Sequence, residues 1–401
     1  MNLLKQQVVE EIDKLKSVLD EISIYIGENP ELGHEEFKAS KVLSETLEDH
    51  GFSVEMGTCN LPTAFRAVFD SGKEGPVVGF MAEYDALPEV GHACGHNLIG
   101  TMGIAAGIGV SKVISETGGK VIVYGTPAEE TRGGKVTMAE EGIFDELDVA
   151  LMVHPLHSYV KSGSSLAMDA IQFEFFGKST HAAASPQEGI NALDAVIQTF
   201  NSINALRQHI LPSARIHGII TEGGKAANVT PDYAVAQFYV RGTTRAYVNE
   251  LTEKVKKCAE GAALQTGAMM KHSFYEFSYD DMITSSGLSE AFTQELISLG
   301  VDSTEIQEQR DGSGSLDMGN VSQVVPSIHP YIKITDGTYA CHTHEFRRAA
   351  MTDQAREAMI LGAKAMALTG VEVLANSELL QKIKAEFALH LSDRHAPEFV
   401  D

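Results

Sequence analysis

A cysteine and a histidine two residues apart, Cys94 and His96, form the segment of this chain with the clearest potential for chemistry. Gly91 and Gly95 flank the cysteine and let the backbone turn sharply there. A thiolate and an imidazole are ligands that zinc prefers in proteins. A buried cysteine beside a turn histidine would explain the same pattern, so the rest of the chain must decide between the two interpretations.

Other potential ligands follow predicted strands or lie in short turns. The acidic pair Glu129 and Glu130 comes soon after the apolar run 121–124, and His154 ends the apolar run 149–153. Near the end of the chain, His342 and His344 stand two residues apart. Taken singly, these are ordinary features of a solvated loop or a buried core. Their combination is what indicates a metal site.

Five donors together suit two zinc ions, with manganese as the alternative metal. They are Cys94, His96, Glu130, His154 and His342. A thiol is deprotonated when it binds a metal ion, so the cysteine could bridge the pair. Two ions about 3.5–4 Å apart polarise a carbonyl and activate a water molecule. Glu129 is then left to take the proton of that water and pass it to the leaving amine.

The elements that must position these residues predict an α/β domain with a mostly parallel sheet. Helical spacing of apolar residues predicts helices at 8–26 and 35–50, and short apolar runs predict strands at 77–82, 121–124 and 149–153. In such sheets functional groups gather at the carboxyl ends of the strands. The acidic pair and His154 follow such ends, as does Asp85.

A second, smaller domain is predicted within this α/β domain. Beyond Gly163 the pattern changes to four strand-like segments and two amphipathic helices, which predict an α+β domain with a four-stranded sheet. From Leu288 the α/β pattern resumes. We therefore predict a catalytic domain of residues 1–168 and 284–401, interrupted by an inserted domain of residues 169–283.

Composition limits the partners of the chain. A formal net charge of −24 argues against binding to nucleic acid or to anionic membrane surfaces, both of which reward clustered Lys and Arg. The longest apolar run, residues 98–110, is too short to span a bilayer and predicts a buried helix with Asn97 as its cap. Four cysteines without a framework spacing favour the cytoplasm. We expect a small-molecule or short-peptide substrate.

Several motifs resemble one known family, in the family's order, from about Ile24 to Ala350. They are Tyr84-Asp85-Ala86-Leu87-Pro88, Gly91-His92-Ala93-Cys94-Gly95-His96-Asn97, Pro127-Ala128-Glu129-Glu130, Gly177-Lys178-Ser179-Thr180-His181-Ala182-Ala183 and His342-Thr343. The family is that of the dinuclear-zinc aminoacylase and carboxypeptidase-G metallopeptidases. Within it the chain is most similar to the amidohydrolase branch that includes aminobenzoyl-glutamate hydrolase and the indole-acetyl-amino-acid hydrolases.

The resemblance implies a metal-dependent hydrolase of the amide bond in N-acyl amino acids, aminobenzoyl-glutamate-like compounds or short peptides. It gives Cys94 the role of bridging thiolate and Glu129 that of general base. The remaining metal ligands would be His96, Glu130, His154 and His342. Asp85 would orient one of those ligands. His181 would stabilise the oxyanion, and Asn228 and Arg245 match positions associated with substrate binding.

The resemblance also implies that the inserted domain acts as a lid and mediates a homodimer, with a tetramer as the alternative. His344 stands where relatives carry proline, which leaves His342 and His344 as candidates for the last ligand. We favour His342 because it keeps the spacing to Phe346.

Two other functions compete with a zinc hydrolase. One is a cysteine hydrolase with Cys94 as nucleophile, which lacks an evident third orienting group. The other is a non-catalytic subunit that uses the same fold to bind a small molecule or peptide. The carboxylate of Glu129 beside the proposed ligands argues against a pure binding protein, which needs no base.

Overall fold

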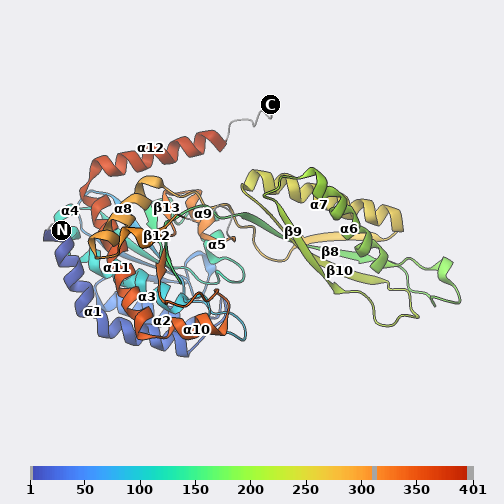
Figure 1. Cartoon of the computed structure of the whole chain (residues 1–401), viewed down its shortest axis with the longest axis horizontal. Helices are drawn as coiled ribbons and strands as arrows, with labels where there is room; N and C mark the ends of the chain where they lie inside the picture. Colours follow the sequence, from blue (N-terminus) through green and yellow to red (C-terminus); the bar gives the residue numbers. More distant parts are fainter. Residues whose placement is uncertain (1–2, 309–313, 395–401) are drawn as a thin grey trace. The chain divides into compact units, whose positions relative to one another are not determined.

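A computed structural model of the chain describes residues 3–308 and 314–394. The chain divides into two compact units (Figure 1). Unit 1 comprises Met1–Ser164, Met282–Asp311 and Asp317–Asp401, and unit 2 comprises Ser165–Asp281 and Gly312–Leu316. The observed boundaries follow Ser164 and Asp281. The boundaries predicted from the sequence, after residues 168 and 283, lie four and two residues further along the chain.

The main sheet of unit 1 has six strands in the order β1-β2-β4-β3-β5-β13. These strands are β1 (Ser53–Met56), β2 (Phe65–Asp70), β3 (Val77–Ala82), β4 (Lys120–Gly125), β5 (Val149–Leu151) and β13 (Ser327–Ile328). The pairs β4–β3, β3–β5 and β5–β13 are parallel, whereas β1–β2 and β2–β4 are antiparallel. The sheet is therefore mixed, with its parallel part where the candidate residues lie.

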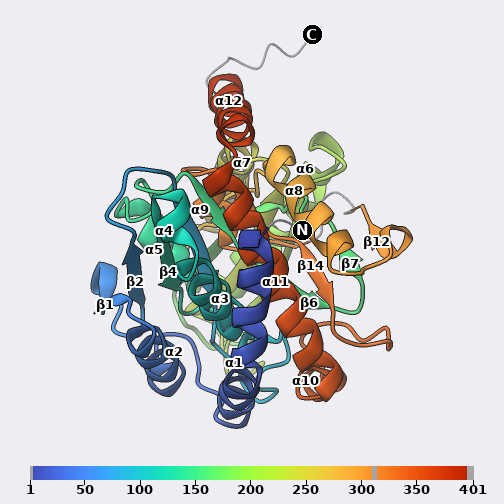
Figure 2. The same ribbon diagram turned by 90° about the vertical axis from the view of Figure 1, so that its left-hand side faces the viewer.

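Three long helices pack together on this sheet, as Figure 2 shows. They are α1 (Leu3–Glu28), α3 (His96–Ser111) and α11 (Asp353–Ala375). Every residue of α3 is buried, and its small residues allow close approach to β3. A Cβ atom on Gly103, for example, would lie only 2.9 Å from the carbonyl oxygen of Met81. The rigid packing of α3 fixes the position of His96 at its first turn.

The remaining helices of unit 1 surround this layer. They are α2 (Phe37–Asp49), α4 (Ile114–Thr117), α5 (Gly134–Glu140), α8 (Ser286–Ser298), α9 (Met318–Ser322), α10 (His344–Ala350) and α12 (Ser377–Arg394), with the 3₁₀ turns Thr58–Asn60 and Ser303–Glu305. Among the described helices, α11 alone has the length and hydropathy of a membrane span, but 78% of its apolar window is buried inside the protein. It is the central helix of this unit's core.

A second sheet in unit 1 was not predicted. It has the order β12-β7-β14-β6, with β6 (His154–Leu156), β7 (Tyr159–Val160), β12 (Ile306–Gln307) and β14 (Tyr331–Lys333). Parallel pairing of β6 with β14 sets His154 directly beside Tyr331. This sheet extends the framework that holds His154.

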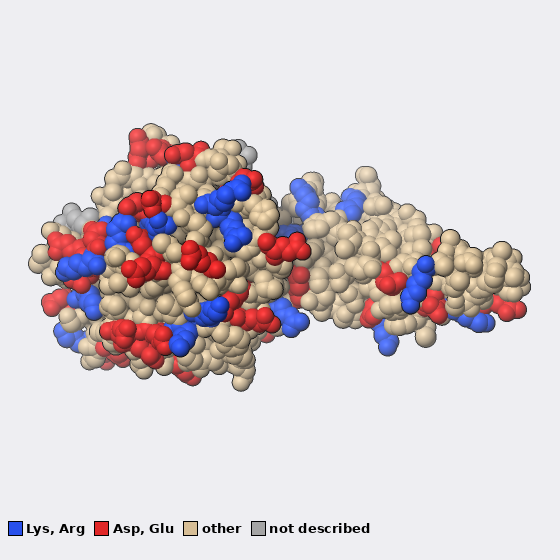
Figure 3. Space-filling view, turned by 90° about the horizontal axis from the view of Figure 1, so that it is seen from below, with Lys and Arg blue, Asp and Glu red and all other residues tan. Residues whose placement is uncertain are grey.

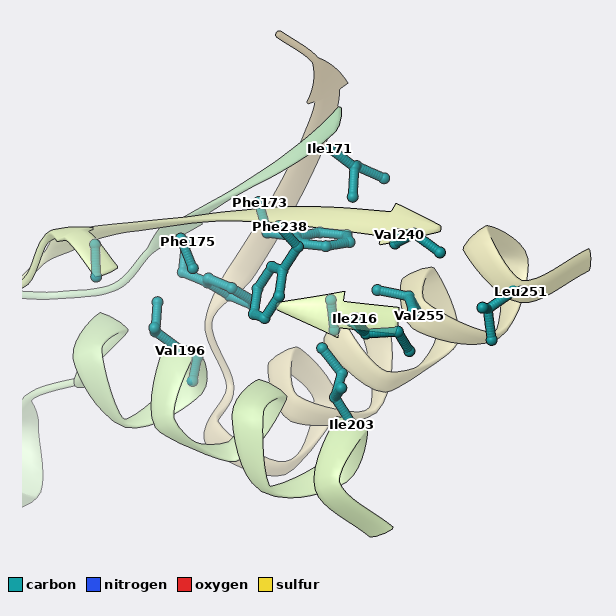
Figure 4. Close-up of a cluster of buried hydrophobic side chains, with 14 of the residues drawn as sticks. Ile171, Phe173, Phe175, Val196, Ile203, Ile216, Phe238, Val240, Leu251 and Val255 are labelled. Carbon is teal, nitrogen blue, oxygen red and sulfur yellow. The ribbon is translucent and has the colours of Figure 1, made fainter. Parts of the chain in front are cut away.

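Unit 2 is an antiparallel four-stranded sheet covered on one face by two helices. The sheet order is β11-β8-β10-β9, with β8 (Ala167–Phe176), β9 (Arg215–Glu222), β10 (Tyr233–Gly242) and β11 (Met269–Phe274). The helices are α6 (Ala192–Leu206) and α7 (Arg245–Thr266), with the 3₁₀ turns Pro186–Glu188 and Arg207–His209. Figure 4 shows Phe173, Phe175 and Phe238 of the strands against Val196 and Val255 of the helices. The predicted four-stranded α+β domain is confirmed.

The surface carries the negative charge expected from the sequence. On the face shown in Figure 3, acidic side chains are spread over unit 1 and are interspersed with Lys and Arg. No broad basic area is visible on this face. The predicted absence of a nucleic-acid or membrane partner stays a prediction.

Candidate metal centre

A tight turn brings Cys94 and His96 to one site at the edge of the main sheet. Gly95 between them adopts the left-handed conformation, with φ of 81°. A Cβ atom there would lie 2.6 Å from Pro155, so only glycine fits. Helix α3 begins at His96, and Gly95 occupies the cap position. The prediction that Asn97 caps this helix is therefore wrong: Asn97 lies in the first turn and its amide donates to the carbonyl oxygen of Ser23 (3.2 Å).

Asp85 holds two of the predicted ligands at once. Its Oδ1 accepts from His96 Nδ1 at 2.8 Å, and its Oδ2 accepts from the backbone N–H of Glu130 at 2.9 Å. A proton on Nδ1 leaves Nε2 of His96 free as a ligand atom. The structure thus gives Asp85 the contact that a ligand-orienting residue needs.

The turn that carries Glu129 and Glu130 is held in an unusual backbone conformation. Ala128 has φ of 64°, a region that residues other than glycine rarely occupy. Its N–H donates to Oε1 of Glu36 at 2.8 Å, and the other oxygen of Glu36 accepts from Thr63 at 2.7 Å. The buried Glu36 therefore fixes the turn from the start of α2, a role that sequence reasoning missed.

His154 reaches Cys94 from the first residue of β6. Its Nε2 lies 3.3 Å from Cys94 Sγ, and its Nδ1 donates to the carbonyl oxygen of Pro155 at 2.7 Å. As with His96, this arrangement directs Nε2 into the site. The side chains of His154 and Cys94 are both buried, so water does not compete for their ligand atoms.

His342 is the histidine of the C-terminal pair that lies at the site. Its Nε2 is 3.2 Å from Glu130 Oε1, and its backbone N–H donates to the carbonyl oxygen of Ala93 at 2.9 Å. His344 is exposed at the start of α10. The geometry therefore favours His342 as the candidate ligand.

Three overlapping groups of donor atoms each lie within 4.8 Å of one another. They are Cys94, His96 and His154; Cys94, Glu130 and His342; and His96, Glu129 and Glu130. Two donors on one tetrahedral zinc ion stand about 3.4–3.6 Å apart. The Cys94 Sγ–His154 Nε2 distance of 3.3 Å and the His96 Nε2–Glu130 Oε1 distance of 3.8 Å bracket this separation.

Unsatisfied polar atoms support the same conclusion. His96 Nε2 and Glu130 Oε1 are buried and make no well-formed hydrogen bond within the described part of the chain, although His342 Nε2 lies 3.2 Å from Glu130 Oε1. Orphaned buried groups of this kind are rare and costly unless a cation completes them. The residues present therefore fit a pair of divalent metal ions.

The charges of the site perturb its titratable groups. Burial raises the pKa of Glu129 far above its usual value, and the neighbouring carboxylates of Glu130 and Glu83 raise it further. Burial would also raise the pKa of Glu130, but the contact with His342 and the charge of His96 lower it overall. The pKa of the Cys94 thiol is raised, first by its hydrogen bond with Cys341 and then by burial. Bound cations would reverse this last effect and favour the thiolate.

His181 and Asn228 lie together in unit 2. Residue 181 forms an isolated β-bridge with Val229, and the carbonyl oxygen of Asn228 accepts from the N–H of Ala182 at 3.0 Å. The Nδ1 atom of His181 accepts from two backbone N–H groups, at 3.3 and 3.2 Å. The proton then sits on Nε2, which makes the exposed ring a donor. The predicted roles of both residues stay predictions.

Arg245 makes contacts that argue against its predicted role in binding substrate. Its guanidinium bonds Asp169 at 2.8 Å, Asn249 at 2.9 Å and the carbonyl oxygen of Met168 at 3.1 Å. These contacts occupy donors that a substrate carboxylate would need. A structural role within unit 2 explains the residue.

Arg241 is a further, partly buried arginine of unit 2 that was not predicted as a site residue. Its Nε is buried and has no hydrogen-bond partner among the described residues, while Nη1 donates to Ser315 at 3.2 Å. The guanidinium also lies 5.3 Å from the centroid of the Tyr239 ring. The strict alternation of β10 could have placed it on the face opposite the core.

A buried ion-pair cluster beside the centre was also missed. The Nζ atom of Lys135 lies 2.5 Å from Oε1 of Glu83 and 2.7 Å from Oδ1 of Asp317. All three side chains are almost completely buried. A lysine after two glycines looks like an exposed loop residue, so no local pattern pointed to this cluster.

Comparisons with known proteins place this architecture in a family. A family model described as a peptidase dimerisation domain matches residues 168–266. The chain is 37% identical to the Xaa-Arg dipeptidase of Mus musculus over 98% of its length and 94% of that protein. It is 31% identical to one of the p-aminobenzoyl-glutamate hydrolase polypeptides of Escherichia coli, over 91% of each chain.

Solved structures share the fold. A dinuclear metal binding peptidase of the M20 family from Bacillus subtilis superposes with a TM-score of 0.69 at 21% identity, over 91% of this chain and 99% of that one. An aminobenzoyl-glutamate utilization protein from Klebsiella pneumoniae gives a TM-score of 0.71 at 18% identity, over 92% and 98%. Because the relatives are similar over more than 90% of the chain and the family model matches unit 2, the chain belongs to the M20 family of metal-dependent peptidases and amidohydrolases.

Proposed function

We propose that this protein is a dinuclear zinc hydrolase that cleaves the amide bond of dipeptides or N-acyl amino acids, with Glu129 as general base. The observation that carries the proposal is the convergence of a thiol, imidazoles and carboxylates with unsatisfied buried ligand atoms, beside the half-buried carboxylate of Glu129. A site that only bound a ligand would have no need of that carboxylate.

The ligands divide naturally between the two ions. In the proposal Cys94 would be shared, His96 and His154 would hold one ion, and Glu130 and His342 would hold the other, as the donor groups divide. The soft thiolate favours zinc over manganese. Bound there, the metal pair polarises the amide carbonyl and makes water a stronger acid.

Glu129 moves the proton. A carboxylate whose pKa is raised by burial and neighbouring carboxylates is a better base than an exposed one. It accepts a proton from the attacking water and delivers it to the leaving amine. Asp85 holds His96 and Glu130 in position, and Glu36 fixes the turn that carries Glu129.

Dipeptides with a basic C-terminal residue are the first substrates to test. The mouse relative acts on Xaa-Arg dipeptides by its name and is similar along almost the whole chain. The bacterial relative points to aminobenzoyl-glutamate as the second class. The net charge of −24 favours a cationic substrate over an anionic one at long range.

Unit 2 supplies the dimer and a donor in this proposal. Strand β9 lies at the edge of its sheet and exposes Ile219 and Ile220, with 62% and 43% of their surface accessible. An exposed apolar edge strand is suited to pairing with a second copy of the chain. His181 would donate to the oxyanion. The four free cysteines suit a reducing, cytoplasmic compartment.

The test combines turnover with metal content. The purified, zinc-loaded chain is assayed against Xaa-Arg and Xaa-Lys dipeptides, N-acyl amino acids and aminobenzoyl-glutamate. Glu129→Gln should lower kcat by roughly 10²–10⁴-fold, as expected for a general base, while both metal ions are retained. The proposal fails if no class is hydrolysed with two ions bound, or if the variant keeps the wild-type rate.

A further inference from the structure

Glu83 is a buried carboxylate for which the proposed mechanism has no use. It follows β3 directly, and only 1% of its surface is accessible. Its Oε1 accepts from Lys135 Nζ at 2.5 Å. Lys135 already has a second buried partner in Asp317, which contacts both its Nζ and its backbone N–H. One carboxylate would neutralise this ammonium, so Glu83 brings one negative charge more than the ion pair requires.

The second oxygen of Glu83 faces the metal centre. Oε2 is buried and has no hydrogen-bond partner within residues 3–308 and 314–394. It lies 3.5 Å from His96 Nε2, which is likewise unpartnered. A neutral His96, with its proton on Nδ1 toward Asp85, presents the lone pair of Nε2 to a carboxylate oxygen. Two acceptors in this position repel each other unless a cation lies between them.

The separation of these two atoms fits a shared metal ion. Donors at about 2.1 Å from one zinc ion stand about 3.4 Å apart at tetrahedral angles. A distance of 3.5 Å is too long for a good hydrogen bond but matches this value. Both atoms are held by other bonds, Glu83 through Lys135 and His96 through Asp85, so their approach is built into the fold.

We propose that Glu83 is a further direct ligand of the metal ion bound by His96, and that Lys135 and Asp317 hold it in position. This inference rests on the proposed dinuclear function. With Cys94 and His154, the ion at His96 would then have four protein donors and be closed, as in structural sites. The other ion, with three, would keep an open position. The two ions should therefore differ in affinity, and the one at His96 should exchange more slowly.

The test compares two substitutions at the same ammonium. Glu83→Gln and Asp317→Asn each remove one negative charge beside Lys135. The amide oxygen left by Glu83→Gln can still accept from Lys135 Nζ, whereas Asp317→Asn loses one of its two bonds to Lys135 and is the more severe change at this residue. Only Glu83 faces His96. Zinc affinity is measured by competition with a chromophoric chelator, and the cobalt-substituted proteins are compared by visible absorption.

The wild type should bind two ions. Glu83→Gln should weaken one of them by more than about 100-fold, beyond the range of about 10–100-fold seen when a residue behind a ligand is lost, and should change the cobalt spectrum. Asp317→Asn should weaken binding by less than about tenfold and leave the spectrum unchanged. Glu83→Asp, which keeps the charge but draws back by one methylene, should resemble Glu83→Gln and serves as the second variant if the glutamine does not fold.

Two results would overturn the inference. One is wild-type affinity for both ions in Glu83→Gln and Glu83→Asp. The other is an equal loss in Asp317→Asn, which would show that only the charge beside Lys135 matters. Both results leave the proposed function intact, whereas a wild-type chain that binds fewer than two ions would refute the function and this inference together.

Discussion

Replacing Asp85 by asparagine should weaken the metal centre without removing any ligand. Asp85 accepts from two N–H donors, His96 Nδ1 at 2.8 Å and the backbone of Glu130 at 2.9 Å. Asparagine offers one acceptor oxygen and one NH₂ donor. In either orientation of the amide, one of the two N–H groups then faces another donor. The substitution therefore breaks one of the two bonds whichever way the side chain settles.

The size of the effect follows from what these bonds hold. Loss of a residue behind a metal ligand costs about 10–100-fold in metal affinity, or roughly 1.4–2.7 kcal/mol at 1.36 kcal/mol per factor of ten. Because Asp85 is 1% exposed, water cannot replace the lost acceptor. We expect a loss of this size for the ion held by His96, measured by chelator competition, and partial recovery of kcat at saturating zinc.

Asp148→Asn is the matched control for Asp85→Asn. Asp148 also accepts from a backbone N–H, that of Val77 at 2.7 Å, but it takes part in none of the three donor groups. Its variant should bind zinc as the wild type does. Unchanged zinc affinity in Asp85→Asn, with the fold intact by circular dichroism, would refute the idea that this carboxylate positions the ligands.

Three further predictions concern other parts of the chain. Burial raises the pKa of Glu36 from 4.5 to about 7, so the protonated side chain stabilises the fold below pH 4.5 and this stabilisation is lost as pH rises toward 7. In urea unfolding, the free energy of unfolding should fall by roughly 2–3 kcal/mol between pH 5 and 8. Glu36→Gln should lack this decrease. Ile219→Asp on the edge strand should convert a dimer into a monomer in light scattering, and a wild type that is already monomeric would exclude this interface. His181→Ala should lower kcat by roughly 10²–10³-fold with zinc content unchanged, and an unaffected kcat would remove the residue from the mechanism.

Much of the fold follows from local patterns in the sequence. The apolar run 77–82 became β3 with the same bounds, and the four strands and two helices of unit 2 are present. These elements are long and periodic enough to be recognised alone. The family, the fold class and the class of hydrolase were likewise confirmed. They could be predicted because the motif around Cys94 is specific to one branch of the family.

Short elements could not be predicted, because tertiary contacts define them. The strands β6, β7, β12 and β14 have two or three residues each and exist only through pairing with one another. The cap of α3 was misassigned to Asn97, because capping statistics favour asparagine while the close approach of Pro155 requires glycine at position 95.

Buried charged residues could not be predicted from the sequence either. Nothing in the sequence distinguishes the buried Lys135 from an exposed lysine, since its partners Glu83 and Asp317 are 52 and 182 residues away. The same holds for Arg245, whose pairing with Asp169 spans 76 residues. Ion pairs between distant segments depend on the packing of the whole domain, and residue type alone favours a solvated position.

Anomalous diffraction from zinc-loaded crystals would locate the metal ions and show whether Cys94 bridges them. Two zinc peaks about 3.5–4 Å apart, with the sulfur of Cys94 bound to both, are the predicted result. A single zinc ion, or a pair bound elsewhere in the chain without this cysteine, would contradict the account.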